Sequence, residues 1–204
     1  KTTVARAIAN MFGLAYVSTG FIYRALTLKA LRAGADTLLE EALVALACSS
    51  DIQVRPDGSG DCRIFLDGED VTAEVNSPEV GAHVSEVARV GRVRAALLDI
   101  QQAIAREGGV VMDGRDIGTV VAPDADVKIF LVADFDERAR RRLAQARERG
   151  YDVREQSVMD EIKHRDRVDS EREAAPLRAA HGAIVVDTTG KTAEETIREV
   201  AELV

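Results

Sequence analysis

The sequence predicts an α/β fold with a parallel sheet, because short apolar runs alternate with amphipathic helical stretches. The apolar runs 110–112, 127–132 and 183–187 are bounded by turn residues, and helical stretches follow the second and third. Parallel strands need crossover helices, so this alternation favours a parallel sheet. With 204 residues and 46% hydrophobic content, the chain can form one globular domain with a substantial core.

The chain begins with a predicted helix over residues 2–12, which is followed by a strand and a second helix. The apolar side chains of the first helix recur at i, i+3, i+4 and i+7, the spacing of one helix face, and are Val4, Ala7, Ile8 and Met11. Gly13 is expected to end this helix. The short apolar run 14–18 predicts a buried strand, and the second helix is expected over 21–32.

A third helix is predicted from the spacing of Thr37 and Glu40, which matches a capping box at a helix start. This helix is expected to run to about Ala47. Further helical patterns begin near residue 78 and cover residues 93–106, 136–149 and 192–203.

Residues 52–75 differ from the rest and predict a small antiparallel unit. Runs 52–54 and 62–66 alternate in the manner of strands, and the turn-rich residues 56–61 join them. The dipeptide Asp67-Gly68 marks another tight turn. We expect this unit to be an excursion from the parallel sheet.

The charge and cysteine content favour a cytoplasmic protein that acts on small molecules. The net charge of −8 argues against general nucleic-acid or anionic-membrane binding. No apolar run reaches the roughly 18 residues of a membrane helix, and no signal-peptide pattern is visible. Cys48 and Cys62 form no CxxC pair, so both are interpreted as reduced and structural. Between Arg138 and Arg172, however, Lys and Arg outnumber Asp and Glu by 11 to 8, which suits an anionic substrate.

The first three residues resemble the end of a phosphate-binding loop. Lys1, Thr2 and Thr3 lead directly into a helix, as the Lys and Ser/Thr of GxxxxGK[ST] do. A helix N-terminus supplies amide groups for phosphate, the Lys reaches the β- and γ-phosphates, and the hydroxyl holds Mg²⁺. The alternative is an ordinary solvated helix start. We expect residues upstream of Lys1 to supply a strand and a glycine-rich loop.

Polar residues 113–116 follow directly on the strand expected at 110–112, where the active-site residues of open α/β sheets collect. Asp113 could orient Mg²⁺ through water, and Arg115 could hold a phosphate with two hydrogen bonds. The alternative is a simple turn, because Asp-Gly is common in turns.

Two basic clusters follow on predicted helices. The first is Arg138, Arg141 and Arg142, which could form only a solvated basic face. The second is Arg165, Asp169 and Arg172, which have i, i+4, i+7 spacing and share one helix face. They could form a salt-bridge ladder worth roughly 0.2–0.5 kcal/mol per pair, or a polyphosphate clamp on a mobile lid.

Several segments together, in this order and spacing, resemble bacterial cytidylate kinases along essentially the whole chain. These segments are 18–24 (STGFIYR), 66–72 (LDGEDVT), 113–121 (DGRDIGTVV), 123–131 (PDADVKIFL), 161–166 (EIKHRD), 175–177 (APL) and 186–190 (VDTTG).

The resemblance implies a three-layer P-loop NTPase fold with a parallel five-stranded sheet in the order 2-3-1-4-5. The first, central strand of that sheet is absent from this sequence. The P-loop core would comprise 1–30, 107–140 and 174–204. Residues 31–106 would form the nucleoside-monophosphate-binding region with the antiparallel insert, and 141–173 a helical lid.

The resemblance also implies the roles of individual residues. CMP would be bound by Thr19, Arg24, Ser85, Arg94, Asp116, Asp169 and Arg172. Of these, Ser85, Arg94 and Asp116 would contact the cytosine, and the family often has Ser in place of Thr19. ATP would be bound by Lys1, Thr2, Thr3, Arg138 and Arg142, and Mg²⁺ by Thr2 and, through water, Asp113. The catalytic residues would be Lys1, Arg115 and Arg165.

The implied reaction is transfer of the γ-phosphoryl group of ATP to CMP or dCMP by a monomer, with Mg²⁺ as cofactor. Positioning and charge neutralisation carry such transfers, so no covalent nucleophile is needed. One alternative is another monophosphate kinase specific for adenylate, uridylate or guanylate. The other is a nucleotide-binding regulatory module without activity.

Overall fold

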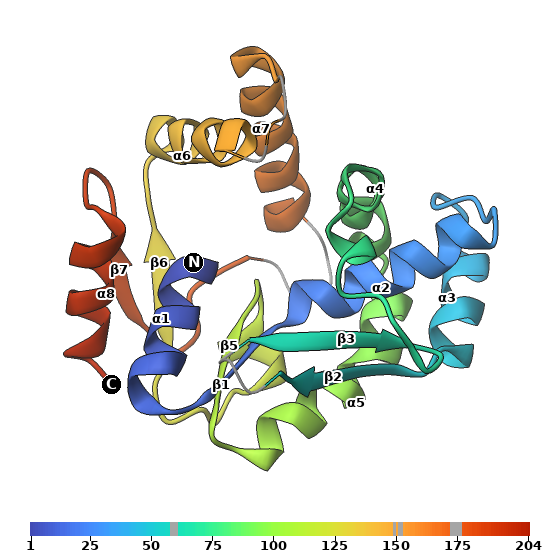
Figure 1. The fold of residues 1–204 in the computed structure, drawn as a ribbon, viewed down its shortest axis with the longest axis horizontal. Helices are drawn as coiled ribbons and strands as arrows, with labels where there is room; N and C mark the ends of the chain where they lie inside the picture. Colours follow the sequence, from blue (N-terminus) through green and yellow to red (C-terminus); the bar gives the residue numbers. More distant parts are fainter. Residues whose placement is uncertain (58–60, 149, 151–152, 172–176) are drawn as a thin grey trace.

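The computed structural model describes the chain except at residues 58–60, 149, 151–152 and 172–176, and only the backbone of residues 56, 165 and 168–171. Helices surround short strands that form three separate groups (Figure 1). Within the described residues, no helix is long and apolar enough to cross a membrane.

The first three elements confirm the sequence prediction closely. Helix α1 spans Thr2–Phe12, and Gly13 ends it in the left-handed conformation, with φ of 66°. Strand β1 covers Ala15–Ser18, and helix α2 follows without a loop as Thr19–Arg32. Because α2 begins immediately after β1, Thr19 lies at the carboxyl end of a strand and in the first turn of a helix.

The predicted capping box at Thr37 is wrong. Helix α3 spans Glu40–Ser49, and Leu39 is its N-cap residue. The Thr37 hydroxyl instead donates to Glu86 Oε2 at 2.7 Å, and Thr37 is 7% exposed. A tertiary partner has therefore taken the hydroxyl that a local cap would have used.

The antiparallel unit is confirmed. Strands β2 (Ile52–Pro56) and β3 (Cys62–Leu66) pair antiparallel, and β4 (Glu69–Asp70) pairs with β3. The turn between β3 and β4 contains Asp67 and Gly68, both with positive φ. A single turn of 3₁₀ helix, η1 (Glu74–Asn76), follows.

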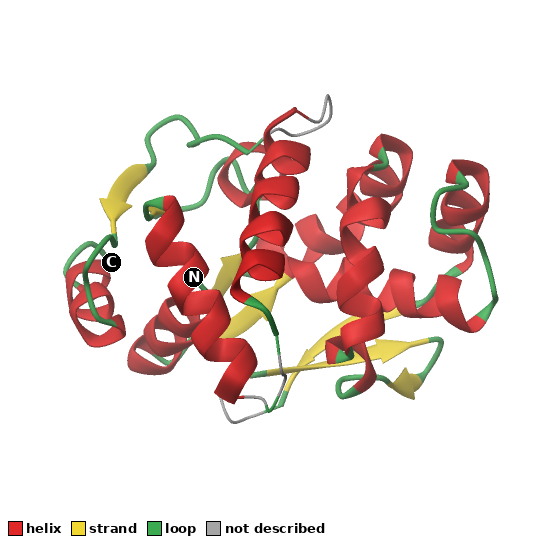
Figure 2. Ribbon diagram, turned by 90° about the horizontal axis from the view of Figure 1, so that it is seen from above, coloured by secondary structure: helices red, strands yellow, loops and turns green. Residues whose placement is uncertain are grey.

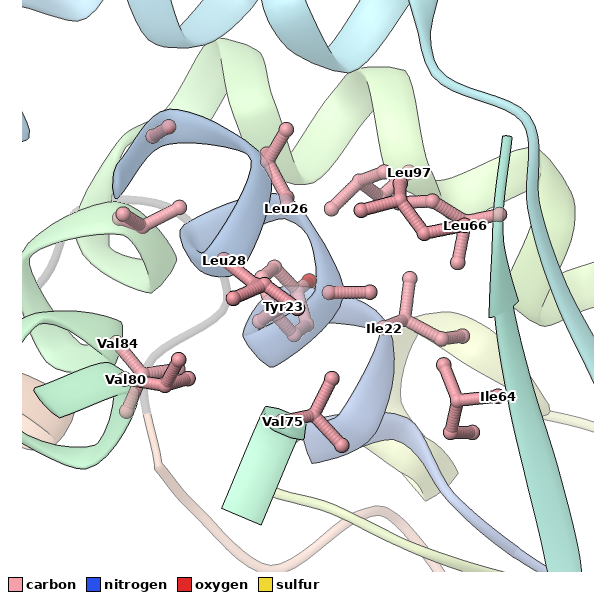
Figure 3. Close-up of a cluster of buried hydrophobic side chains, with 14 of the residues drawn as sticks. Ile22, Tyr23, Leu26, Leu28, Ile64, Leu66, Val75, Val80, Val84 and Leu97 are labelled. Atoms are coloured by element: carbon pink, nitrogen blue, oxygen red, sulfur yellow. The ribbon is translucent and has the colours of Figure 1, made fainter. Parts of the chain in front are cut away.

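The antiparallel unit packs with four helices around the larger hydrophobic cluster, shown in Figure 3. The helices are α2, α3, α4 (Pro78–Arg89) and α5 (Gly91–Glu107). The fully buried side chains of this cluster include Ile22, Leu26, Ile64 and Leu97. This cluster fixes α2, α4 and α5 relative to one another, and these helices carry residues expected to bind CMP.

The parallel strands form two pairs within the described structure, where one five-stranded sheet was expected. Strand β5 (Val110–Asp113) pairs with β1, and β6 (Ile129–Val132) pairs with β7 (Ile184–Asp187). Both pairings are parallel, as predicted. A cavity of about 750 Å³ is lined by β5, by β6 and by the first half of α1. The two pairs therefore border the same space without bonding to each other.

A second, smaller hydrophobic cluster joins both pairs of parallel strands to the terminal helices. It contains Val4 and Ile8 of α1 and Val200 of α8 (Ala193–Ala201). Val111 of β5 and Ile129 of β6 pack against it. The start of α1 is thereby held above the cavity between β5 and β6.

Helices α6 and α7 project from the end of the molecule opposite α5 (Figure 1), and Figure 2 shows the same fold from above. A short π-helix, η2 (Ile117–Val121), follows β5, α6 (Phe135–Glu148) follows β6, and α7 (Glu155–Glu171) comes next. Helix α7 contacts both α6 and α4. These contacts connect the β6–β7 side of the molecule to the helices around the antiparallel unit.

Candidate active site

The carboxyl ends of β1 and β5 lie side by side and bring together polar residues from distant parts of the sequence. Ser18 of β1 is in register with Asp113 of β5, so Thr19 and Gly114 follow at the same edge. The Thr19 hydroxyl donates to the Asp113 carbonyl at 3.1 Å, and Thr19 is 3% exposed. The first turn of α2 is therefore bonded to the end of β5.

The segment 113–116 is packed into the structure and is more than an exposed turn. A Cβ atom on Gly114 would lie 2.4 Å from Thr19 Oγ1 and 2.7 Å from Ile117 Cδ1. Residues 113–115 are half-buried and Asp116 is buried. Only glycine fits at position 114, because any side chain would displace the buried Thr19 hydroxyl.

Asp113 joins β5 to the start of α1. Its Oδ2 accepts a hydrogen bond from Thr2 Oγ1 at 2.9 Å. Lys1, Asp113 and Arg115 line the same cavity, and Thr3 is exposed in the first turn of α1. Of the residues that the sequence proposed for phosphate and Mg²⁺, the structure thus places Lys1, Asp113 and Arg115 on one cavity, with Thr2 bonded to Asp113.

Tyr16 is a participant in this site that the sequence did not reveal. Its hydroxyl donates to Asp113 Oδ2 at 3.1 Å. Burial, followed by the charge of Asp113, raises the pKa of Tyr16 above its ordinary value, so the phenol stays protonated and remains a donor. A tyrosine inside a buried strand was the available signal, because a buried phenol needs a hydrogen-bond partner.

Arg94 forms a buried ion pair with Asp116, three residues after the end of β5. Arg94 Nη2 donates to Asp116 Oδ2, and the two residues are 7% and 5% exposed. Arg94 Nη1 donates to the Ala88 carbonyl at 3.1 Å. Arg94 Nε is buried and has no hydrogen-bond partner among the described residues. The pair joins α5 and α4 to the segment after β5.

Ser85 and Arg24 lie on the two helices next to this ion pair. Ser85 is half-buried on α4, three residues before Ala88, so both residues lie on one side of that helix. Arg24, on α2, donates from Nη1 to the Val75 carbonyl at 2.9 Å. Three of the residues expected to bind CMP thus lie on helices that pack together: Arg24 on α2, Ser85 on α4 and Arg94 on α5.

Arg138, Arg141 and Arg142 of α6 each make hydrogen bonds, although their side chains stay partly exposed to solvent. Arg138 Nη1 donates to Asp166 of α7 at 2.8 Å. Arg142 Nη2 donates to Glu161 of α7 at 3.4 Å. Arg141 donates to the Thr188 carbonyl at 2.6 Å and so ties α6 to the loop after β7. Two of the three arginines connect α6 to α7.

The last predicted cluster is described only in part. Arg165 and Asp169 lie in α7, but their side chains are outside the described residues. Arg172 lies outside the described residues altogether. Their expected roles therefore stay predictions.

The sequence is similar to known proteins along its whole length. A family model described as cytidylate kinase matches residues 1–204. A cytidylate kinase of Pelotomaculum thermopropionicum is 47% identical over 198 residues, which cover 97% of this chain and 88% of that protein. One of Geobacillus thermodenitrificans is 47% identical over 204 residues, covering 100% of this chain and 91% of that protein. One of Caldanaerobacter subterraneus subsp. tengcongensis is 46% identical over 204 residues, which cover 100% of this chain and 89% of that protein.

Proposed function

This chain belongs to the cytidylate kinase family, and we propose that it transfers the γ-phosphoryl group of ATP to CMP or dCMP, giving CDP or dCDP. The observation that carries the proposal is the buried Arg94–Asp116 pair beside Thr19 at the end of β5.

A buried ion pair calls for an explanation, because removing two charges from water costs several kcal/mol per ion. A polar ligand that uses the remaining hydrogen-bonding capacity of the pair supplies one. Cytosine presents an exocyclic amine beside a ring nitrogen and a carbonyl. A carboxylate can accept from the amine while a guanidinium donates to the ring nitrogen or the carbonyl. Nη1 and Nη2 of Arg94 each carry two N–H groups and each make one hydrogen bond among the described residues, which leaves donors for a base.

The rest of the CMP site is proposed on helices α2 and α4, together with Asp169 and Arg172. Ser85 would complete the base contacts, and Thr19 and Arg24 would hold the acceptor phosphate. Asp169 would bind the sugar hydroxyls and Arg172 a phosphate or sugar oxygen; both are assigned by family resemblance. The Thr19 hydroxyl donates to the Asp113 carbonyl in this structure. It has a single hydrogen, so it would have to turn from that carbonyl to donate to the phosphate.

The residues at the start of α1 suit Mg²⁺ and the phosphates of ATP. Thr2 Oγ1 and Asp113 Oδ2 are hard oxygen donors 2.9 Å apart, the ligand type that Mg²⁺ takes together with substrate phosphates. Thr2 would hold the ion directly and Asp113 through water. When bound, the ion neutralises charge on the β- and γ-phosphates.

Transfer itself is proposed to depend on cationic side chains that surround the reacting phosphates. Lys1, Arg115 and Arg165 would stabilise the charge that develops on the transferred group. Lys1, Thr2, Thr3, Arg138 and Arg142 would bind ATP. The bonds of Arg138 and Arg142 to α7 support a lid whose position depends on the same arginines.

We also propose the five-stranded order 2-3-1-4-5, with β1–β5 and β6–β7 as its two sides. The cavity between β5 and β6 supports this order, because it lies where the central strand would run. The core would be 1–30, 107–140 and 174–204, the monophosphate-binding region 31–106 and the lid 141–173. We also propose a protein without nucleic-acid partners, which the net charge of −8 supports. A cytoplasmic location is proposed because both cysteines are interpreted as reduced, and a monomer is proposed by family resemblance.

The test is an ADP-release assay with Mg²⁺-ATP and each of CMP, dCMP, UMP, AMP and GMP as acceptor. We expect CMP and dCMP to be preferred. Asp116→Asn should raise the KM for CMP at least tenfold and leave the KM for ATP largely unchanged. Asp99→Asn is the matched control, because Asp99 is an exposed aspartate on α5, the helix that carries Arg94. Equal rates with AMP and CMP, or no phosphorylation of any acceptor, would contradict the proposal.

A further inference from the structure

Tyr23 lies against the guanidinium of Arg94. Tyr23 is on α2, four residues after Thr19, and is only 6% exposed. Arg94 Cζ lies 5.1 Å from the centroid of its ring. This distance is within the range of a cation–π contact, which is strongest where both groups are removed from water, as they are here.

The ring completes a set of contacts that surround the guanidinium from three different elements. Nη2 bonds to Asp116 after β5, Nη1 bonds to the Ala88 carbonyl on α4, and the ring contributes from α2. A guanidinium donates its hydrogen bonds near its own plane, whereas the ring lies against its central carbon and adds a contact of a different kind. Without the ring, Arg94 would keep its partners and lose the contact that restricts its tilt.

Tyr23 is itself supported at its far end by Gln101. Gln101 is on α5, seven residues after Arg94, so two turns of one helix separate the two residues that touch Tyr23. Gln101 is 1% exposed; its Nε2 lies 3.4 Å from the Tyr23 hydroxyl and donates to the Leu97 carbonyl at 3.0 Å. One face of α5 therefore contacts Tyr23 through both its hydroxyl and its ring.

We infer that Tyr23 is a positioning residue for acceptor specificity: its ring fixes the plane in which Arg94, paired with Asp116, meets the acceptor base. This inference rests on the proposed function, because it assigns Tyr23 to the reading of the base by Arg94. Tyr23 acts through Arg94 and takes no part in the transfer. Gln101 supports the ring and contributes less than the ring itself.

The experiment compares Tyr23→Phe, which keeps the ring and loses the hydroxyl, with Tyr23→Leu, which removes the ring. The steady-state KM and kcat are measured for CMP, for AMP and for ATP. Tyr23→Phe should keep the KM for CMP within about threefold of the unaltered protein. Tyr23→Leu should raise it about tenfold, lower the preference for CMP over AMP and leave the KM for ATP unchanged.

A fluorination series separates the electrostatic contact from packing and does not depend on whether Tyr23→Leu folds. Phenylalanine with zero, one, two or three ring fluorines at position 23 changes the ring volume little while weakening its attraction for a cation. The KM for CMP should rise stepwise along this series at constant KM for ATP. A flat series, or equal rises in both KM values, would overturn the inference. If the unaltered protein shows no preference for CMP, the proposed function itself has failed.

Discussion

At the scale of single residues, two side chains of the proposed site, Asp113 and Arg94, each make several contacts. Asp113 accepts from Thr2 and Tyr16 through its side chain and from Thr19 through its carbonyl. Arg94 is held by Asp116 and the Ala88 carbonyl. These bonds give the ATP side and the CMP side of the proposed site a common anchor at the end of β5.

The first prediction concerns Gly114, at which the chain cannot accept a side chain. In Gly114→Ala the new methyl group would displace the buried Thr19 hydroxyl and Ile117. We expect the KM for CMP to rise at least tenfold, together with a destabilisation of about 1–3 kcal/mol from overpacking. Steady-state kinetics and urea unfolding measure the two effects.

Gly81→Ala is the matched control for this substitution. A Cβ at Gly81, in α4, has no atom closer than Arg24 Nη1 at 4.0 Å, so alanine fits there. Alanine is also favoured over glycine inside a helix. A Gly114→Ala protein that behaves like Gly81→Ala in both measurements would show that the close approach at 114 is unimportant.

At the scale of elements, long-range hydrogen bonds set the connections between helices. Thr37, in the loop before α3, bonds to Glu86 of α4 and lies 3.3 Å from Nδ1 of His83. His83 Nδ1 is also 3.2 Å from the Glu86 carboxylate. This cluster ties the α2–α3 connection to the helix that carries Ser85.

The second prediction concerns how the stability supplied by the hydrogen bond from Thr37 to Glu86 depends on pH. The hydrogen bond from Thr37, followed by the contact with His83, lowers the pKa of Glu86 below its ordinary value. A carboxylate with a lowered pKa in the folded state stabilises the fold above its unfolded pKa of about 4.3, and this contribution is lost as the pH falls through the folded pKa.

Thr37→Val removes the donor while keeping the shape of the side chain. We expect a loss of about 1–2 kcal/mol in the free energy of unfolding at pH 7, a loss that becomes smaller as the pH falls below about 4. Urea unfolding at several pH values measures it, and Thr37→Ser, which keeps the hydroxyl, is the control. A cost that does not change with pH would show that the Glu86 carboxylate is not involved.

At the scale of the whole molecule, two hydrophobic clusters hold two different sets of elements, and each set carries one side of the proposed site. The larger cluster holds α2, α3, α4, α5 and the antiparallel unit together. The smaller one joins α1 and α8 to β5 and β6. Strand β5 ends between the two, because Asp113 bonds to α1 and to the start of α2.

The third prediction is that the two nucleotides protect different parts of the backbone from hydrogen exchange. CMP should slow exchange in α2, α4 and α5 and, through Asp169, in α7, whereas a non-hydrolysable ATP analogue should slow it in α1, α6 and α7. Hydrogen exchange with mass spectrometry measures both. Asp116→Asn should abolish the CMP effect and keep the ATP effect. The same protection pattern for both ligands would contradict two separate subsites.

Most elements could be predicted because their signals lie in residues that are close together in the sequence. The apolar spacing from Val4 to Met11 and the helix-ending Gly13 predicted α1 correctly, and the alternation in 52–54 and 62–66 predicted β2 and β3. Propensity and periodicity act over a few residues, and a single sequence contains that information. The capping box predicted at Thr37 was wrong for the opposite reason, because the hydrogen-bond partner of Thr37 is 49 residues away.

The sequence by itself determined the α/β class, the order of the elements and the residue types that end each strand. Only the tertiary structure decided that Thr2 meets Asp113 across 111 residues, that Arg94 pairs with Asp116, and that Tyr16 and Tyr23 support these groups. It also decided that the described parallel strands form two pairs beside one cavity. The physical reason is that a hydrogen bond between distant residues forms only where packing has already brought the two groups together and removed water.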